Sequence, residues 1–174
     1  MSYPTKYDQS ISEKEDFWRA EAQKINWFTF PETILSKDGD DLYTWYAGGK
    51  MNTSYLALDI HVAQGRGEQT ALIYDSPVTG VKKQFTYSEL LYEVSLFAGV
   101  LKAQGVEKGD RIVIYMPMVP EAVIGMLACA RIGAVHSVVF GGFAAHELAI
   151  RINDARPKYI LMASGGKEID KIIP

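Results

Sequence analysis

The hydrophobic pattern is strongest between positions 111 and 143, where it predicts a strand, a helix and a second strand. Residues 111–115 are β-branched and apolar, which is typical of a strand buried on both faces. Residues 120–132 are apolar almost all round, so we expect a deeply covered helix rather than an amphipathic one. Residues 135–140 predict another buried strand. Such a unit indicates two parallel strands joined by a right-handed crossover.

Local signals mark both ends of the central helix. Pro120 is tolerated in a first helical turn, and Glu121 places negative charge near the positive N-terminal end. Gly133 is a residue type that commonly follows the last turn, because it adopts the left-handed backbone conformation freely. We interpret Arg131, near that end, as a partner of the helix dipole rather than as a ligand-binding group.

The preceding segment predicts a hairpin and an amphipathic helix. Residues 70–75 and 82–85 are typical of two strands joined by a turn of Ser, Pro, Thr and Gly residues. Thr86 and Glu89 then form a capping-box pattern. It opens a helix with apolar residues at spacings of three and four, which ends at Gly105.

The segment from residue 145 to residue 162 continues the alternation of strands and helices. Residues 145–153 predict a helix and residues 159–162 a third apolar strand, which gives strand, helix, strand, helix, strand from position 111 onward. That order is one half of a doubly wound parallel sheet. We therefore predict an α/β fold, with an irregular and helical N-terminal segment, a β-hairpin and a βαβαβ half-sheet. Because the last strand has no helix after it to cover the sheet, we expect an incomplete domain that is a fragment of a larger protein.

The N-terminal residues carry weaker signals. Residues 1–10 are polar and predict a mobile arm. Ser12 and Glu15 match a second capping box, which predicts a short helix to about residue 23 with Phe17 and Trp18 as its apolar anchors.

Residues 26–39 predict irregular structure, and residues 42–46 predict a short strand. Asn52 is expected to cap a helix that continues to about residue 62. Regular alternation of elements begins only after this helix. We therefore divide the chain into an N-terminal extension, residues 1–66, and the first part of a large domain, residues 67–174.

Composition excludes several classes of function. The chain has 174 residues, 48% of them hydrophobic and 22% charged, with a net charge of −3, so it has no general attraction for nucleic acid or anionic membranes. Charged residues and prolines interrupt the longest apolar run, so we expect no membrane span. The acidic N-terminus resembles neither a secretory signal nor a transit peptide. A cytoplasmic location is the expectation, with the mitochondrial matrix left open.

The cysteine and the histidines, taken by themselves, do not indicate a catalytic or metal-binding site. The single cysteine, Cys129, lies mid-helix, so we expect a core residue and a reducing compartment. The histidines His61, His136 and His146 stand without the spacing of metal ligands, so we expect structural or surface roles and no metal site. These observations leave the turns at the strand ends as the candidate sites.

Two glycine-rich turns follow predicted parallel strands, at the edge where α/β sheets bind ligands. Gly141 and Gly142 suit either a tight turn, which we favour, or the close approach of a ligand to the backbone. Residues 164–167, with Lys171 after them, suit either a solvated loop or a phosphate contact through backbone N–H groups and an ammonium. The pattern alone favours the solvated loop.

Several motifs resemble the N-terminal part of the short-chain acyl-CoA synthetases, the acetyl-CoA and propionyl-CoA synthetases of the adenylate-forming, AMP-binding superfamily. The resemblance covers nearly the whole chain and is most specific from Tyr115 to Phe143. The motifs that carry it are Lys108-Gly109-Asp110, Tyr115-Met116-Pro117-Met118, Pro120-Glu121-Ala122, residues 126–138 and Phe140-Gly141-Gly142-Phe143, with looser matches at Phe17-Trp18, Trp27, Trp45-Tyr46, Gly48-Gly49, Asn52, Leu58-Asp59, His61, Thr86-Tyr87 and Glu89-Leu90.

The resemblance implies a two-step ligase. A carboxylate attacks the α-phosphate of ATP, with Mg²⁺ bound to the nucleotide, to give an acyl-adenylate and pyrophosphate, and the thiol of CoA then displaces AMP. The catalytic segments of the family lie beyond residue 174, so no catalytic residue is assigned here. What the resemblance does carry over is part of the CoA site: Gly141 and Gly142 along the pantetheine arm, and Glu168, Ile169, Asp170 and Lys171 at the 3′-phosphate end.

The last of these segments departs from the acetyl-CoA synthetase pattern, which places an arginine at each end. Glu168 takes the first position and Lys171 the last. Lysine keeps the charge but loses the bidentate fork of arginine. The arrangement resembles the propionyl-type branch more closely, so the resemblance favours propionate over acetate.

Two functional hypotheses follow. In the first, the chain is a fragment of an ATP-dependent short-chain carboxylate–CoA ligase, inactive alone, whose partners are small molecules and whose uncovered sheet promotes self-association. In the second, it is a stand-alone α/β module that binds CoA or another protein without catalysis. We expect neither form to bind nucleic acid or a membrane, and we expect no cofactor bound to the fragment itself.

Overall fold

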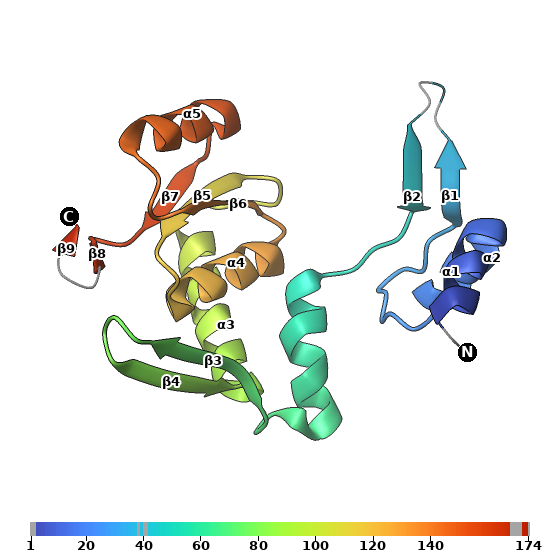
Figure 1. Ribbon diagram of the computed structural model, residues 1–174, viewed down its shortest axis with the longest axis horizontal. Helices are drawn as coiled ribbons and strands as arrows, with labels where there is room; N and C mark the ends of the chain where they lie inside the picture. Colours follow the sequence, from blue (N-terminus) through green and yellow to red (C-terminus); the bar gives the residue numbers. More distant parts are fainter. Residues whose placement is uncertain (1–2, 38, 40–41, 168–171, 174) are drawn as a thin grey trace. The chain divides into compact units, whose positions relative to one another are not determined.

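The computed structural model of the chain describes residues 3–37, 39, 42–167 and 172–173 (Figure 1). The chain divides into two compact units, Met1–Met51 and Asn52–Pro174. The boundary predicted at residue 66 therefore falls inside the second unit.

The first unit contains two helices and one antiparallel strand pair. The elements are α1 (Tyr3–Ser12), α2 (Lys14–Ala22), β1 (Thr33–Lys37) and β2 (Tyr43–Ala47). Leu35 pairs with Trp45 in the centre of the two-stranded sheet. The indole Nε1–H of Trp27 donates to the carbonyl of Ala22 at 2.8 Å, which fixes the segment between α2 and β1.

Three predictions for this unit are wrong. The mobile arm is instead α1, in which the rings of Tyr3 and Tyr7 stack one turn apart with centroids 6.4 Å from each other. Ser12 does not cap a helix, because its hydroxyl donates back to the Asp8 carbonyl at 2.9 Å and so belongs to α1. The supposedly irregular segment 26–39 contains β1, in which Ile34 is fully buried.

The helix predicted to end near residue 23 is present as α2, and the strand predicted over residues 42–46 is present as β2. Trp18 on α2 packs edge-on against Trp45 on β2, with ring centroids 5.8 Å apart. Aromatic pairs in this geometry add to the free energy of burying the two rings.

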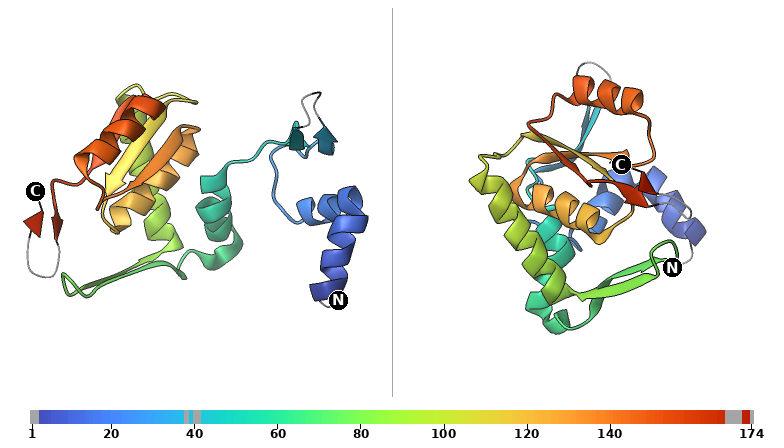
Figure 2. Two further views of the ribbon diagram at one scale, coloured as in Figure 1. Left: turned by 45° about the horizontal axis from the view of Figure 1, so that its top comes forward. Right: turned by 90° about the vertical axis from the view of Figure 1, so that its left-hand side faces the viewer.

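The second unit is layered, as Figure 2 shows: a hairpin, packed helices, a parallel sheet and a further helix on the sheet. Its elements are two π-helical segments, η1 (Tyr55–Asp59) and η2 (Val62–Arg66), the hairpin β3 (Thr70–Ser76) and β4 (Val81–Thr86), then α3 (Tyr87–Ala103), β5 (Arg111–Met116), α4 (Pro120–Ile132), β6 (Val135–Phe140), α5 (Ala145–Ala155), β7 (Tyr159–Met162), β8 (Gly166–Lys167) and β9 (Ile172–Ile173).

The sheet confirms the predicted βαβαβ order. β5 lies in the centre and pairs in parallel with β6 on one side and β7 on the other. The parallel register places Met116 opposite Phe140, so the carboxyl ends of β5 and β6 lie level. The expected α/β half-sheet is therefore the fold of this unit.

The predicted helix boundaries are also confirmed. In α3, the Thr86 hydroxyl accepts from the Glu89 N–H at 3.1 Å while the Glu89 carboxylate accepts from the Thr86 N–H at 2.8 Å, which is a complete capping box. In α4, Pro120 occupies the first turn and Gly133 adopts φ +76° just past the last turn. No residue from 122 to 132 is exposed, as expected for a covered helix.

The core lies between α3, α4 and β5. Val94, Ile112, Ala128 and Cys129 are all fully buried within it. Cys129 is thus the core residue that its mid-helix position predicted, and burial raises the pKa of its thiol to about 11. At neutral pH the thiol stays protonated, so this cysteine is a poor nucleophile.

The prediction that β6 is buried is wrong. Only Val139 is fully buried, whereas Val138 and Phe140 are 54% and 60% exposed. The exposed residues 136, 138 and 140 alternate along β6, so the described residues leave one face of this edge strand uncovered. Apolar sequence alone cannot tell a central strand from an edge strand.

The helix predicted after Asn52 is present but has an unusual form. The Asn52 side-chain oxygen accepts from the Tyr55 N–H at 3.1 Å, so the predicted cap is confirmed. The segment then winds in wide π-helical turns, η1 and η2, to Gly65 at φ +79°. A π-helix does not have the 3.6-residue period of an α-helix, so the apolar residues of this segment are not spaced as one α-helical stripe.

Acid is expected to destabilise this unit partly through His61. Its ring lies 4.6 Å from that of Tyr87, and its Nδ1 atom is buried with no hydrogen-bond partner among the described residues. Burial, and then the charge of Arg66, lower the pKa of His61 below 6.5. The unfolded chain therefore binds this proton more readily, and stability is lost as the pH falls below about 6.5.

We expect the His61→Phe variant, which keeps an aromatic ring, to lose less unfolding free energy than the wild type between pH 7.5 and pH 5.5, measured by urea denaturation. A residual slope remains because burial also lowers the pKa of His136. Equal slopes in both proteins would exclude His61 as a contributor.

Candidate functional site

The parallel strands place three chain turns along one edge of the sheet. β5, β6 and β7 end at Met116, Phe140 and Met162, and each carboxyl end is followed by a short loop. Ligands of open α/β sheets bind at this edge. The predicted Gly141-Gly142 turn is one of these loops.

The double-glycine turn is held by side chains from both sides. The Phe143 N–H donates to the Phe140 carbonyl at 3.0 Å, which closes a tight turn over the two glycines. The hydroxyl of Tyr115, on β5, donates to the Phe143 carbonyl at 2.8 Å. The Arg151 guanidinium, on α5, lies 4.6 Å from the centre of the Phe143 ring.

The two glycines differ in what surrounds them. A Cβ atom added at Gly141 would lie 2.9 Å from the backbone carbonyl of Met116 and from the nitrogen of Pro117. At Gly142 the nearest atom, at 2.7 Å, belongs to the ring of Phe140, a side chain that can turn away. Packing alone therefore accounts for Gly141, while Gly142 is exposed and open to a ligand. The predicted CoA contact of both residues stays a prediction.

Replacing Gly141 by alanine is expected to destabilise the second unit by about 1–3 kcal/mol, because the new methyl group meets rigid backbone. Gly99→Ala on the exposed face of α3 is the matched control. No atom lies within 4 Å of its added Cβ, so helix propensity predicts a gain of about 0.5–1 kcal/mol. Urea denaturation measures both. A neutral Gly141→Ala variant would show that the turn moves freely relative to β5.

The structure describes the neighbours of the other predicted CoA segment but not the segment itself. Residues Glu168, Ile169, Asp170 and Lys171 lie outside the described residues. The described residues on either side, Gly166–Lys167 and Ile172–Ile173, pair as antiparallel strands β8 and β9.

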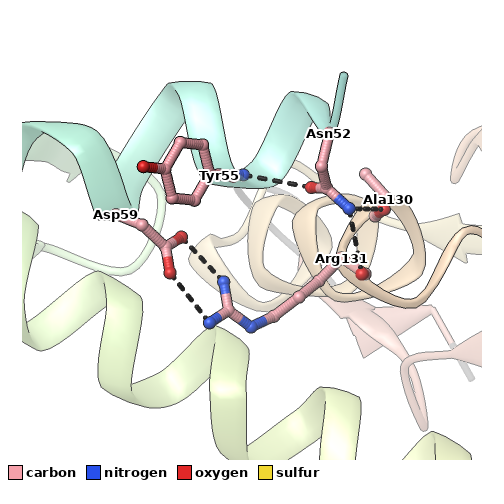
Figure 3. A network of polar contacts seen from close by, with 5 residues as sticks. All are labelled: Asn52, Tyr55, Asp59, Ala130 and Arg131. Atoms are coloured by element: carbon pink, nitrogen blue, oxygen red, sulfur yellow. Dashed lines mark hydrogen bonds and ion pairs between the residues drawn. The ribbon is translucent and has the colours of Figure 1, made fainter. Parts of the chain in front are cut away.

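A network of polar contacts lies at the C-terminal end of α4 (Figure 3). The Asn52 side chain donates from Nδ2 to the carbonyls of Ala130 and Arg131, at 3.1 Å and 3.0 Å. Its oxygen caps the helix that begins at Asn52, as described above. One side chain therefore binds two of the last carbonyls of α4 and one N–H at the start of the π-helical segment η1.

Arg131 reinforces the same junction. Its guanidinium donates to both oxygens of Asp59 in η1, at 2.7 Å and 2.9 Å, in a bidentate pair that is about three-quarters buried. The hydrogen bonds from Arg131 to the Asp59 carboxylate raise the pKa of the arginine. Our interpretation of Arg131 as a helix-dipole partner missed this carboxylate, 72 residues away in sequence. We call Asn52, Asp59 and Arg131 the α4 clamp.

A second, exposed pair lies at the start of the sheet. Lys158 donates to the Asp110 carboxylate at 2.8 Å, and Asp110 also accepts from the Glu107 N–H at 2.7 Å. These contacts lower the pKa of Asp110 and raise that of Lys158. Across the described residues, no group of three or more His, Cys, Asp and Glu side chains converges as metal ligands do.

Comparison with known proteins gives two family matches in order along the chain. Residues 60–173 match the model of the AMP-binding enzyme family, and residues 3–57 match the acetyl-coenzyme A synthetase N-terminus. The chain belongs to the AMP-binding enzyme family. The family expected from the motifs around Phe140-Gly141-Gly142-Phe143 is thereby confirmed.

Three relatives show the place of this chain within the family. It is 54% identical over 173 residues to an uncharacterized protein of Pseudomonas aeruginosa, covering 99% of this chain and 28% of that protein. It is 47% identical over 166 residues to a mitochondrial acyl-CoA synthetase short-chain family member of Bos taurus, covering 95% and 24%. The acetoacetyl-CoA synthetase of Streptomyces lividans has the same fold, with a TM-score of 0.89 and 26% identity, covering 99% and 27%.

The chain thus spans about a quarter of the length of these relatives. Within it, the α4 clamp joins the two matched regions: Asn52 lies in the synthetase N-terminus, Asp59 between the matches, and Arg131 in the AMP-binding region. No described helix has the length and apolar character needed to cross a lipid bilayer.

Proposed function

We propose that this chain is the N-terminal part of an ATP-dependent short-chain carboxylate–CoA ligase that forms AMP, with propionate preferred over acetate. The observation that carries the proposal is the ordered pair of family matches, a synthetase N-terminus followed by the AMP-binding region. The Bos taurus relative is named as a short-chain acyl-CoA synthetase and the Streptomyces lividans one as an acetoacetyl-CoA synthetase, so both names denote the synthesis of an acyl-CoA.

In this proposal the reaction needs ATP, CoA and a carboxylate as substrates, with Mg²⁺ accompanying the nucleotide. The chain's contribution is to the CoA side. Gly142, exposed at the carboxyl edge of the sheet, provides bare backbone for the pantetheine arm, and Gly141 holds the turn against β5. The 3′-phosphate of CoA is predicted to contact the positively charged side chain of Lys171. We place the enzyme in the cytoplasm.

The chain by itself is proposed to be inactive, because the resemblance assigns it no catalytic residue. The test compares two proteins, the 174 residues alone and the polypeptide that carries this chain within a full-length synthetase. We expect AMP formation that depends on both CoA and the acid from the second only, with a higher kcat/KM for propionate than for acetate. Activity of the isolated 174 residues would contradict the assignment of catalysis to other segments.

The CoA role has its own readout in the full-length protein. Gly142→Ala is expected to raise the KM for CoA several-fold while leaving the KM for ATP and for the acid unchanged. An unchanged KM for CoA would remove Gly142 from the site. Equal rates with propionate and acetate would overturn the acid preference without touching the ligase assignment.

A further inference from the structure

The turn after β6 is hydrogen-bonded to the central strand through a tyrosine side chain. The hydroxyl of Tyr115 donates to the Phe143 carbonyl at 2.8 Å, across 28 positions of sequence. The backbone of Tyr115 is fixed, because β5 pairs with β6 on one side and with β7 on the other. Gly142 and Phe143, by contrast, are exposed. A strand inside the sheet thus holds an exposed turn.

The other contacts of Phe143 hold it less firmly. Its N–H donates to the Phe140 carbonyl, at 3.0 Å, within the same turn. The ring of Phe140 approaches its ring edge-on, with centroids 5.9 Å apart, but Phe140 is itself 60% exposed. Arg151 lies against the Phe143 ring and also pairs with Glu147 on its own helix, at 3.3 Å. Within the described residues, the hydrogen bond from Tyr115 is therefore the one that links Phe143 to β5.

The two glycines make this link important for a ligand. Glycine has the widest choice of backbone conformations and loses the most conformational freedom when it is ordered. Gly141 is confined by the backbone of Met116, whereas the atoms nearest to Gly142 belong to the Phe140 side chain. A ligand that must order a loose turn binds more weakly than one that meets a turn already held in shape.

We propose that Tyr115 is a positioning residue for CoA. It acts through Phe143, by holding the Gly141-Gly142 turn in the shape that accepts the pantetheine arm, and not by touching CoA. This inference rests on the proposed contact between CoA and Gly142. It adds a side chain on β5 to which the family resemblance gives no role.

The sheet supplies a matched tyrosine for comparison. The hydroxyl of Tyr159 donates to the Gln104 carbonyl at 2.7 Å, which is the same kind of bond as that of Tyr115. Tyr159 begins β7 and lies opposite Ile112, near the start of β5, whereas Tyr115 lies near the end of β5. Replacing either tyrosine by phenylalanine removes one bond from a hydroxyl to a carbonyl and keeps the ring.

The test uses the full-length synthetase that carries this chain, with the variants Tyr115→Phe, Tyr159→Phe and Gly142→Ala. We expect Tyr115→Phe to raise the KM for CoA roughly two- to tenfold, the range that corresponds to one lost hydrogen bond. The KM values for ATP and the acid are expected to stay unchanged. So is the rate of acyl-adenylate formation, measured without CoA by pyrophosphate exchange into ATP. Tyr159→Phe is expected to leave the KM for CoA unchanged, although it removes an equivalent bond.

Hydrogen exchange on the same proteins measures the turn directly. Without CoA, the backbone N–H groups of residues 141–144 are expected to exchange faster in Tyr115→Phe than in the wild type or in Tyr159→Phe. With saturating CoA, the difference is expected to disappear, because the bound ligand orders the turn. Equal exchange in all three proteins without CoA would overturn the proposal, since the turn would not depend on Tyr115.

The kinetic outcomes separate this proposal from the one on which it rests. If Gly142→Ala raises the KM for CoA and Tyr115→Phe does not, the turn binds CoA but Tyr115 does not position it. If neither variant raises the KM for CoA, the CoA contact of the turn fails, and the role of Tyr115 fails with it. An increase in Tyr115→Phe alone would place its effect outside the turn, and an equal increase in Tyr159→Phe would show a general loosening of the sheet. Each of these results overturns the proposal.

Discussion

Replacing Arg131 by alanine is expected to lower the unfolding free energy of the second unit by about 3 kcal/mol. The change removes the bidentate pair and leaves the Asp59 carboxylate, only 22% exposed, without its cation. An unpaired carboxylate that is largely removed from water carries most of that cost. Urea denaturation of the chain, followed by far-UV circular dichroism, measures the loss.

Matched variants separate charge from geometry. Arg131→Lys keeps the charge but loses the two-point fork, so about half of the loss is expected. The exposed pair Lys82–Asp75 is the control: its side chains are 78% and 52% exposed, and Lys82→Ala is expected to cost less than about 1 kcal/mol. Equal losses at the two pairs would show that the α4 clamp contributes no more than an ordinary surface ion pair.

The partner residue gives a further check on the same pair. Asp59→Asn keeps the shape of the side chain but removes its charge. If Arg131 and Asp59 act as one unit, the double variant is expected to cost clearly less than the sum of the single variants. Additive losses would mean that each residue stabilises the unit through other contacts.

Replacing Ile112 by alanine is expected to cost about 3–4 kcal/mol, the largest effect we expect from a core truncation here. Ile112 lies on the central strand β5, is fully buried, and belongs to the core shared by α3 and α4. Strands flank β5 on both sides, so the backbone has little freedom to close the cavity that the smaller side chain leaves.

Ile150→Ala on α5 is the control for the same chemical change. Ile150 is 48% exposed, and alanine is the better helix former, so a change of less than about 1 kcal/mol is expected. Thermal unfolding monitored by circular dichroism ranks the two variants. A loss at Ile112 no larger than that at Ile150 would mean that the core between β5 and α3 is loosely packed.

The sequence predicted the second unit well because its signals are local. The capping box of Thr86 and Glu89, Pro120 at the start of α4 and Gly133 at its end each act within one helical turn. The hairpin and the parallel strands followed from apolar runs and turn residues. Three predictions for the first unit failed because the local signals were weak there. Ser12, for example, has the residue type of a cap but bonds back into α1.

The candidate site was predicted only in part. Sequence placed Gly141 and Gly142 at the carboxyl edge of the sheet, where they lie. It could not tell which glycine is required by packing, because the atoms that approach Gly141 belong to Met116 and Pro117 on another strand end. The α4 clamp was missed as a unit: Asn52 was recognised as a cap, while its second role and the Arg131–Asp59 pair had no local signal.

What the sequence determined by itself is therefore the family and, from β3 to β7, the order of the elements and the ends of the helices α3 and α4. Caps, turns and periodicity depend on residues a few positions apart, and the family motifs are runs of such residues. What only the tertiary structure decided is which carboxylate Arg131 meets, why Gly141 must be small, and that β6 lies at an edge with Val138 and Phe140 exposed. Each of these depends on distances between segments far apart in the chain, which are fixed by packing and leave no mark on the residues nearby.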